Sequence, residues 1–117
     1  NDSEIEMWGD GSARREFMYV KDLIDFLYYA IINFDRLPQF INVGTKKDYT
    51  VDEYYKVISK IVGFKGNIIK NTRRPTGMIR KKVSTALLKK FGWESKINLK
   101  AGLKLTYEYF LDSYKSK

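Results

Sequence analysis

The chain has 117 residues, 44% of them hydrophobic and 31% charged, a composition that suits one small folded domain. It contains no cysteine and no histidine, which excludes disulfides, thiolate or imidazole metal ligands, and two common catalytic side chains. Lysine and arginine outnumber aspartate and glutamate by 22 to 14, so the net charge of +8 predicts an anionic ligand or partner.

The ends of the chain bear on its location. The N-terminal residues lack a charged start, an apolar stretch and a small-residue cleavage site. No stretch approaches the roughly 18 apolar residues that would span a membrane. We therefore expect a cytoplasmic protein with no membrane partner. The chain starts at Asn1 and not at Met, which we interpret as a sign that it is a fragment.

The first third predicts a hairpin or a tight loop, followed by a helix. Residues 4–8 and 14–19 are typical of extended segments, and the Gly-Asp-Gly-Ser sequence of residues 9–12 is a strong turn signal between them. Residues 20–34 carry apolar side chains at helical spacing on most faces, which predicts a largely buried helix.

The middle of the chain predicts a strand and a well-capped helix. Residues 40–43, Phe-Ile-Asn-Val, are typical of a short strand. Thr50 and Glu53 have the spacing of a capping box, and Gly63 is a typical helix stop. A helix is therefore expected between Thr50 and Gly63.

The last third predicts a short strand at residues 67–72, a loop at 73–80 and two helices. The first helix would begin at its cap Ser84 and end near Phe91, and the second would cover residues 98–114. The whole order predicts a mixed α/β (α+β) chain with about four helices. Its few short strands do not comfortably close a sheet, so we expect a missing partner.

Catalytic motifs are absent. The sequence has no Gly-x-Gly-x-x-Gly, no Gly-Lys-Ser/Thr phosphate loop, no Gly-x-Ser-x-Gly and no Tyr-x-x-x-Lys. Two pairs of carboxylates, Asp22 with Asp25 and Asp52 with Glu53, lie in the first turns of expected helices, where the helix dipole favours negative charge. We therefore predict no catalytic residue, no cofactor-binding residue and no metal site in this chain.

Five of the six arginines fall in two short segments, Arg14-Arg15 and Arg73-Arg74 with Arg80. A guanidinium offers paired donors that match phosphate oxygens. The two clusters could converge on one diphosphate. The alternative for Arg14 and Arg15 is that they only solvate a strand end.

Aromatic residues allow two interpretations. Trp8 precedes the turn and could stack on a base or sugar, or could pack beside the hairpin. For the tyrosines on expected helical faces, core or interface packing is favoured over base stacking; these are Tyr28, Tyr29, Tyr54, Tyr55, Tyr107 and Tyr109.

Residues 8–22 resemble a known family pattern. Their sequence, Trp-Gly-Asp-Gly-Ser-Ala-Arg-Arg-Glu-Phe-Met-Tyr-Val-Lys-Asp, is similar to the W-G-x-G-x-x-x-R-E-F-x-x-V-x-D segment in the C-terminal half of extended short-chain dehydrogenase/reductases, the NAD-dependent epimerase/dehydratase family. Further similar stretches follow in family order at residues 40–45, 61–66, 74–81, 91–93 and 99–103. Within the family the chain most resembles the GDP-L-fucose synthase branch, NADPH-dependent epimerase/reductases.

The resemblance implies a substrate-binding role for five residues. Trp8 and Arg15 would contact the nucleotide-diphosphate sugar, with Arg15 on the diphosphate, and the loop carrying Arg74, Thr76 and Arg80 would close over the nucleotide. Residues 1–117 would then be a C-terminal binding domain. NADP, the catalytic Tyr-x-x-x-Lys and the Rossmann domain would belong to the N-terminal part of a homodimeric parent, so this chain alone would not catalyse the reaction.

Two positions depart from the family pattern. Thr76 stands where the family usually has an aspartate, and a hydroxyl accepts a hydrogen bond without being an anionic acceptor, which leaves the nucleotide base open. Ser84 replaces another aspartate and is an equally good helix cap.

Three alternatives remain. One is another NAD-dependent nucleotide-sugar epimerase/dehydratase. A second is a small basic nucleic-acid-binding module, supported only by the charge and the 15% aromatic content. Dispersed lysines argue against nucleic acid as the partner. A helical interaction module is compatible with the first interpretation.

Overall fold

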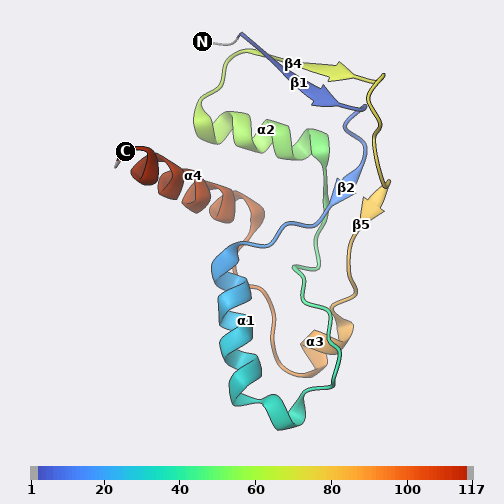
Figure 1. The fold of residues 1–117 in the computed structure, drawn as a ribbon, viewed down its shortest axis with the longest axis vertical. Helices are drawn as coiled ribbons and strands as arrows, with labels where there is room; N and C mark the ends of the chain where they lie inside the picture. The colour runs from blue at the N-terminus through green and yellow to red at the C-terminus, as the bar shows by residue number, and fades with distance from the viewer. Residues whose placement is uncertain (1–2, 116–117) are drawn as a thin grey trace.

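Residues 3–115 are described by a computed structural model, in which two small sheets and four α-helices follow one another along an elongated molecule (Figure 1). The expected mixed α/β class, with about four helices and few short strands, is confirmed.

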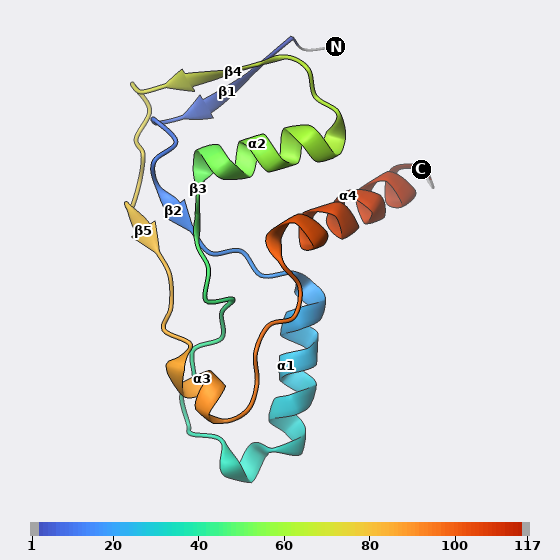
Figure 2. The same ribbon diagram turned by 180° about the vertical axis from the view of Figure 1, so that it is seen from behind.

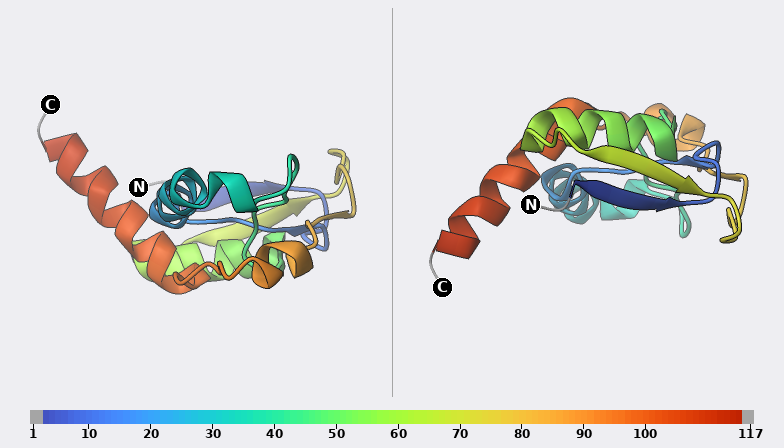
Figure 3. Two further views of the ribbon diagram at one scale, coloured as in Figure 1. Left: turned by 90° about the horizontal axis from the view of Figure 1, so that it is seen from below. Right: turned by 90° about the horizontal axis from the view of Figure 1, so that it is seen from above.

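The first sheet has two parallel strands, β1 (Glu4–Trp8) and β4 (Asn67–Asn71). The hairpin alternative is therefore wrong, because β1 pairs with a distant segment and not with the residues after the turn. The tight-loop alternative fits, since residues 9–13 join β1 directly to the next strand. Helix α2 (Val51–Val62) lies along one side of this pair (Figure 3). Met7 of β1 and Tyr54 of α2 are buried.

The second sheet has three very short strands with β2 (Arg14–Arg15) at its centre. On one side β3 (Tyr49–Thr50) is antiparallel, and on the other β5 (Arg80–Lys81) is parallel (Figure 2). The loop predicted at residues 73–80 is therefore one residue too long, since Arg80 is already in a strand.

Helix α2 begins and ends as the sequence predicts. Thr50 Oγ1 accepts from Glu53 N at 3.1 Å, while a Glu53 carboxylate oxygen accepts from Thr50 N at 2.7 Å. Gly63 ends the helix with a φ of 72°, a conformation that other residues rarely adopt.

A second body of the molecule forms around α1 (Val20–Ile32) and α3 (Ala86–Lys90). Phe26, Leu88 and Trp93 are its buried core. The Phe26 and Trp93 rings meet edge to face at 5.3 Å between centroids. After α1 the chain makes a short 3-10 turn and returns toward β3 (Figure 1).

Two local predictions are wrong in this body. Residues 40–43 form no strand: Ile41 and Val43 pack against the core and Phe40 is 86% exposed, an alternating pattern without a partner strand in the described part of the chain. Ser84 does not cap α3, because the residue before the helix is Thr85, whose side chain makes no cap.

Helix α4 (Leu99–Lys115) begins as predicted, with the Asn98 side chain accepting from Ala101 N at 3.0 Å. Its C-terminal half extends away from the other elements (Figure 3). Tyr107, Phe110 and Tyr114 stack in sequence along it.

The surface is larger than a complete domain of this mass would show. The accessible surface is 9131 Å², against about 6,600 Å² for a folded monomer of this size. The radius of gyration is 17.2 Å, against about 13 Å. Helix α1 contributes a large share of this exposed surface, since its side chains Ile24, Tyr28 and Ile31 are 57%, 67% and 73% exposed. Between residues 3 and 115, no helix combines the length and apolar character needed to cross a membrane.

The packing predictions for the tyrosines have mixed outcomes. Tyr54 is packed in the core as predicted, whereas Tyr28 and Tyr109 are 67% and 74% exposed. Core packing is therefore wrong for these two tyrosines, while the interface and base-stacking alternatives stay open.

Candidate functional site

Two connections between the sheets run side by side, one from β1 to β2 and one, residues 72–79, from β4 to β5 (Figure 1, Figure 2). Both strand pairs are parallel, so the connections leave together and arrive together. Gly9 N donates to Asn71 O at 2.9 Å where they start, and Arg14 N donates to Ile79 O at 2.7 Å where they end. The two arginine-containing segments are therefore neighbours.

Trp8, Arg74 and Thr76 meet at the start of these connections. The Arg74 guanidinium lies over the Trp8 ring, with Cζ 4.9 Å from the ring centroid, in a cation–π contact. Trp8 is 58% exposed. Gly9 has a φ of 79°, and a Cβ there would lie 2.9 Å from Thr76 Oγ1. The close approach of the two connections thus depends on Gly9.

Arg15 reaches from β2 to the second connection. Its Nη1 donates to Met78 O and to its own neighbour Arg14 O, both at 2.7 Å. The Arg15 backbone is held in turn, because Tyr54 Oη donates to Arg15 O at 2.8 Å. Nε and Nη2 of Arg15 carry no hydrogen bond within residues 3–115. These N–H groups remain available to an anion.

Arg80 lies apart from this group and binds Asp48. The Asp48 carboxylate accepts from Arg80 Nε, from Arg80 Nη2 at 3.2 Å and from Arg14 Nη2 at 3.3 Å, and the Asp48 carbonyl accepts from Arg14 Nη2 at 2.7 Å. The Asp48 side chain is 5% exposed. The hydrogen bond from Arg80 is the main reason that the pKa of Asp48 lies well below its usual range, and Arg14 adds to it. The same contact raises the pKa of Arg80.

The arrangement suits recognition of an anion that carries a flat ring. Arg15 offers free donors, and Trp8 with Arg74 offers an aromatic and cationic surface. Across the described residues, no cluster of three or more acidic side chains could hold a metal ion. Residues 1–117 also contain no glycine-rich dinucleotide motif.

Known proteins match this chain over most of its length. Residues 1–44 match the model of the NAD dependent epimerase/dehydratase family. GDP-L-colitose synthase from Yersinia pseudotuberculosis is 54% identical over 94% of this chain and 36% of that enzyme. GDP-L-fucose synthase from Azorhizobium caulinodans is 35% identical over 92% of this chain and 34% of that enzyme. GDP-mannoheptose C4 reductase from Campylobacter jejuni, solved with NADP bound, superposes with a TM-score of 0.81 at 34% identity, over 92% of this chain and 35% of that structure.

Over residues 1–44 the chain matches the NAD dependent epimerase/dehydratase family, and over more than nine-tenths of its length it is similar to enzymes named for GDP-linked sugars. It spans about a third of the length of the relatives it matches. The resemblance to the epimerase/dehydratase family and to its GDP-L-fucose synthase branch is therefore confirmed. All three relatives are named for a GDP-linked sugar.

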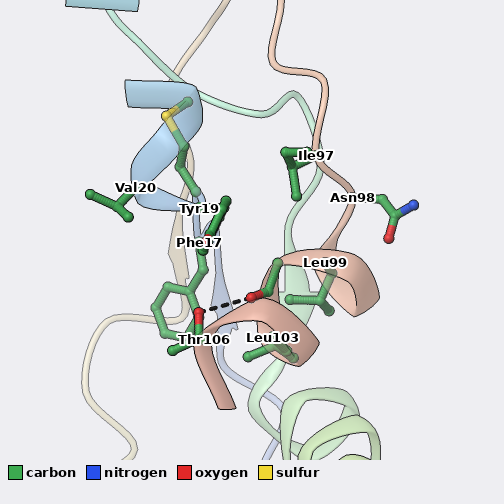
Figure 4. A pocket seen from close by; sticks show the side chains of 10 residues that line it. Phe17, Tyr19, Val20, Ile97, Asn98, Leu99, Leu103 and Thr106 are labelled. Carbon is green, nitrogen blue, oxygen red and sulfur yellow. Dashed lines mark hydrogen bonds between the residues drawn. The ribbon is translucent and has the colours of Figure 1, made fainter. Parts of the chain in front are cut away.

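A cavity of about 360 Å³ lies elsewhere in the chain, between the residues after β2 and the start of α4 (Figure 4). Apolar side chains form most of its wall, including Phe17, Leu99 and Leu103, and Thr106 Oγ1 donates to Gly102 O at 2.8 Å. No charged side chain lines it, so it cannot balance the charge of a diphosphate. None of the five predicted site residues lines this cavity.

Four of the five predicted residues, Trp8, Arg15, Arg74 and Thr76, lie along the paired connections, and Arg80 faces Asp48.

Sequence reasoning missed Asp48 and the close contact at Gly9. Nothing in the Lys-Lys-Asp sequence at 46–48 indicates that pairing of β2, β3 and β5 brings two arginines to this carboxylate. The sequence around Gly9 indicates a turn, but it does not indicate that Thr76 lies against this glycine.

Proposed function

We propose that this chain is the nucleotide-sugar-binding part of an NADP-dependent sugar-nucleotide epimerase/reductase that acts on a GDP-linked sugar, in the manner of GDP-L-fucose synthase. The observation that carries the proposal is Arg15, whose guanidinium is fixed on Met78 O while Nε and Nη2 stay free, on the same pair of connections that carries the Trp8 and Arg74 contact. The sequence identity to GDP-L-colitose and GDP-L-fucose synthases supports the choice of GDP.

Each residue of the site has a part in this proposal. Arg15 forms forked hydrogen bonds to the diphosphate. Trp8 stacks on the base or ribose, with Arg74 adding positive charge. Thr76 accepts or donates one hydrogen bond. Arg80 contributes positive potential from its place beside Asp48, without direct contact while that ion pair is closed.

The remaining steps belong to other parts of the parent. The chain has no Tyr-x-x-x-Lys and no dinucleotide fingerprint, so its share is to hold the nucleotide and align the sugar. NADP supplies the hydride when bound to the Rossmann domain. We assign residues 1–117 to the binding domain and expect no turnover from them alone. Its location in the cytoplasm stays a prediction.

The expected Rossmann partner fits the exposed surface. The chain exposes about 2,500 Å² more than a complete domain of its mass, an area in the range of permanent interfaces. The apolar face of α1, including Ile24 and Ile31, accounts for part of it. We propose that the N-terminal domain of the parent covers this face. A homodimer of the parent stays a proposal as well.

Calorimetric titration with GDP, UDP and a single-stranded oligonucleotide at physiological salt tests the binding proposal. GDP should bind, and Arg15→Ala should weaken it by roughly tenfold to a hundredfold, because charge-assisted hydrogen bonds are lost. Arg36→Ala is the matched control, since it removes the same charge from the exposed turn after α1.

Each outcome of the titration has a clear meaning. Preference for UDP would move the chain to another nucleotide-sugar branch of the family. Binding of the oligonucleotide alone, with steep salt dependence, would favour the basic nucleic-acid module. Equal GDP affinities for the Arg15 and Arg36 variants would contradict the proposed site.

A further inference from the structure

Arg15 stands between two residues that are both tied down. Successive residues of a strand point to opposite faces, and the register of β2 with β5 sets Arg14 directly beside Arg80. These two side chains share one face, where the nearly buried Asp48 carboxylate joins them. Arg15 is directed to the other face, toward Met78 O.

Glu16, the residue that follows Arg15 in the chain, is held by hydrogen bonds to its carboxylate. One carboxylate oxygen accepts from Thr45 N at 2.5 Å and Lys46 N at 3.1 Å, and the other accepts from Val83 N at 3.0 Å. The contact needs Gly44, since a Cβ there would lie 2.6 Å from Glu16 Oε1. Glu16 thereby joins the segment before β3 to the segment after β5.

The same two stretches of chain are thus held on both sides of Arg15. Residues 44–48 contribute Asp48 and the two N–H groups bound by Glu16, and residues 80–83 contribute Arg80 and Val83 N. The strand between them is only two residues long, so its own ladder fixes little. Side chains must supply the rigidity that longer strands obtain from backbone pairing.

We propose that Asp48, with Glu16, is a positioning residue for the anion site at Arg15. It acts through Arg14 and Arg80, which hold β2 against β5 so that the Arg15 guanidinium stays fixed beside residues 72–79. It does not touch the ligand. The proposal rests on the proposed nucleotide-binding function, and it gives Arg80 a second role as part of this anchor.

The test is the GDP affinity of Asp48→Asn, which keeps the shape of the side chain and removes its charge. We expect affinity to fall roughly tenfold, because a mobile guanidinium pays an ordering cost when it binds. Asp35→Asn, in the exposed turn after α1, controls for the change of charge. Asp22→Asn controls for lost stability, since Asp22 lies in the other body of the molecule.

A double-mutant cycle separates positioning from a general structural effect. If Asp48 works through Arg15, Asp48→Asn should weaken GDP binding no further in the Arg15→Ala background. An equal loss in both backgrounds would overturn the proposal, as would unchanged affinity in a folded Asp48→Asn variant. If Arg15→Ala itself leaves affinity unchanged, the proposed function fails, which is a different result.

A second measurement needs no ligand. The ¹⁵N-labelled Nε–H resonance of Arg15 should be distinct and should report restricted motion in the unaltered chain, because Nη1 of the same guanidinium is held by Met78 O. In Asp48→Asn it should move toward the resonance of Arg36, and in Asp35→Asn it should not. An unmoved Arg15 resonance in Asp48→Asn would overturn the proposal whatever the chain binds.

Discussion

Single residues at the paired connections set the geometry of the candidate site. The free Nε and Nη2 donors of Arg15 have a fixed position because Met78 O accepts from its Nη1 and the Tyr54 hydroxyl donates to its backbone carbonyl. Gly9 lets the second connection approach, since Thr76 occupies the space a side chain would need. A cluster of arginines becomes a site only where such neighbours fix it.

Gly9→Ala and Gly63→Ala form a matched pair that tests this close approach. Both glycines have positive φ, 79° and 72°, so each alanine should lower the unfolding free energy by about 1 kcal/mol. At Gly63 a Cβ would meet nothing within 4 Å, whereas at Gly9 it would displace Thr76. Urea denaturation measures the loss of unfolding free energy that is expected for both variants.

GDP titration of the same two variants should weaken binding only for Gly9→Ala. Equal affinities would show that the contact between Gly9 and Thr76 is irrelevant to the site.

At the scale of elements, Asp22 shows how a polar group can join segments far apart in the chain. The sequence places it in the first turn of α1, and it lies there. Its carboxylate nevertheless serves another segment: it accepts from Lys96 N at 3.2 Å and Ile97 N at 2.9 Å. The side chain of Asp22 thus connects α1 to the residues that lead into α4.

Asp22→Asn should destabilise the chain by about 1–3 kcal/mol, because the amide nitrogen of asparagine faces a backbone N–H that is then left without an acceptor. Asp22 is 3% exposed, so water cannot replace the lost bond. Urea denaturation beside Asp35→Asn measures the difference. Equal midpoints for the two variants would show that the bonds from Lys96 and Ile97 add nothing to stability.

The predicted strands illustrate why elements differ in how well sequence reveals them. Residues 40–43 alternate as a strand would, and Ile41 and Val43 do point to the core. A strand also needs a neighbour to hydrogen-bond with, and none is present among residues 3–115. Helix α2 carries its signals within its own sequence, from Thr50 to Gly63, and was predicted to within a residue.

The molecule as a whole should lose stability in acid. The pKa values of several carboxyls lie below their ordinary ones because hydrogen bonds and nearby cations favour the charged form; they are Asp10, Asp25, Asp48, Asp52, Glu53 and Glu94. For a lowered pKa, stability is present above the unfolded value and is lost as pH falls toward the folded value. The loss should therefore begin near pH 4 and deepen below it.

Thermal unfolding at several values between pH 7 and pH 2 checks this prediction. The melting temperature should change little above about pH 5 and fall steeply below pH 4. Asp48→Asn should show a shallower acid slope than Asp35→Asn, because the pKa of Asp48 is lowered by Arg80 and Arg14. A melting temperature that stays constant to pH 2 would contradict it.

What the sequence determined by itself is local or compositional. It includes the mixed α/β class, the helices with their own caps and stops, the lack of catalytic and dinucleotide motifs, and the residue types suited to an anion. Such features depend on side chains within a turn or two of one another. The family resemblance added the order of the motifs and pointed to the arginines.

Tertiary structure alone decided which segments meet. Parallel pairing of β1 with β4 and of β2 with β5 brings Trp8 and Arg15 beside residues 72–79, and places Arg80 on Asp48 instead. Backbone pairing over such sequence separations depends on the packing of the whole chain, since the same short strand pattern is compatible with many partners. The order of residues therefore indicated the chemistry of the site, and the packing of the sheets decided which residues supply it.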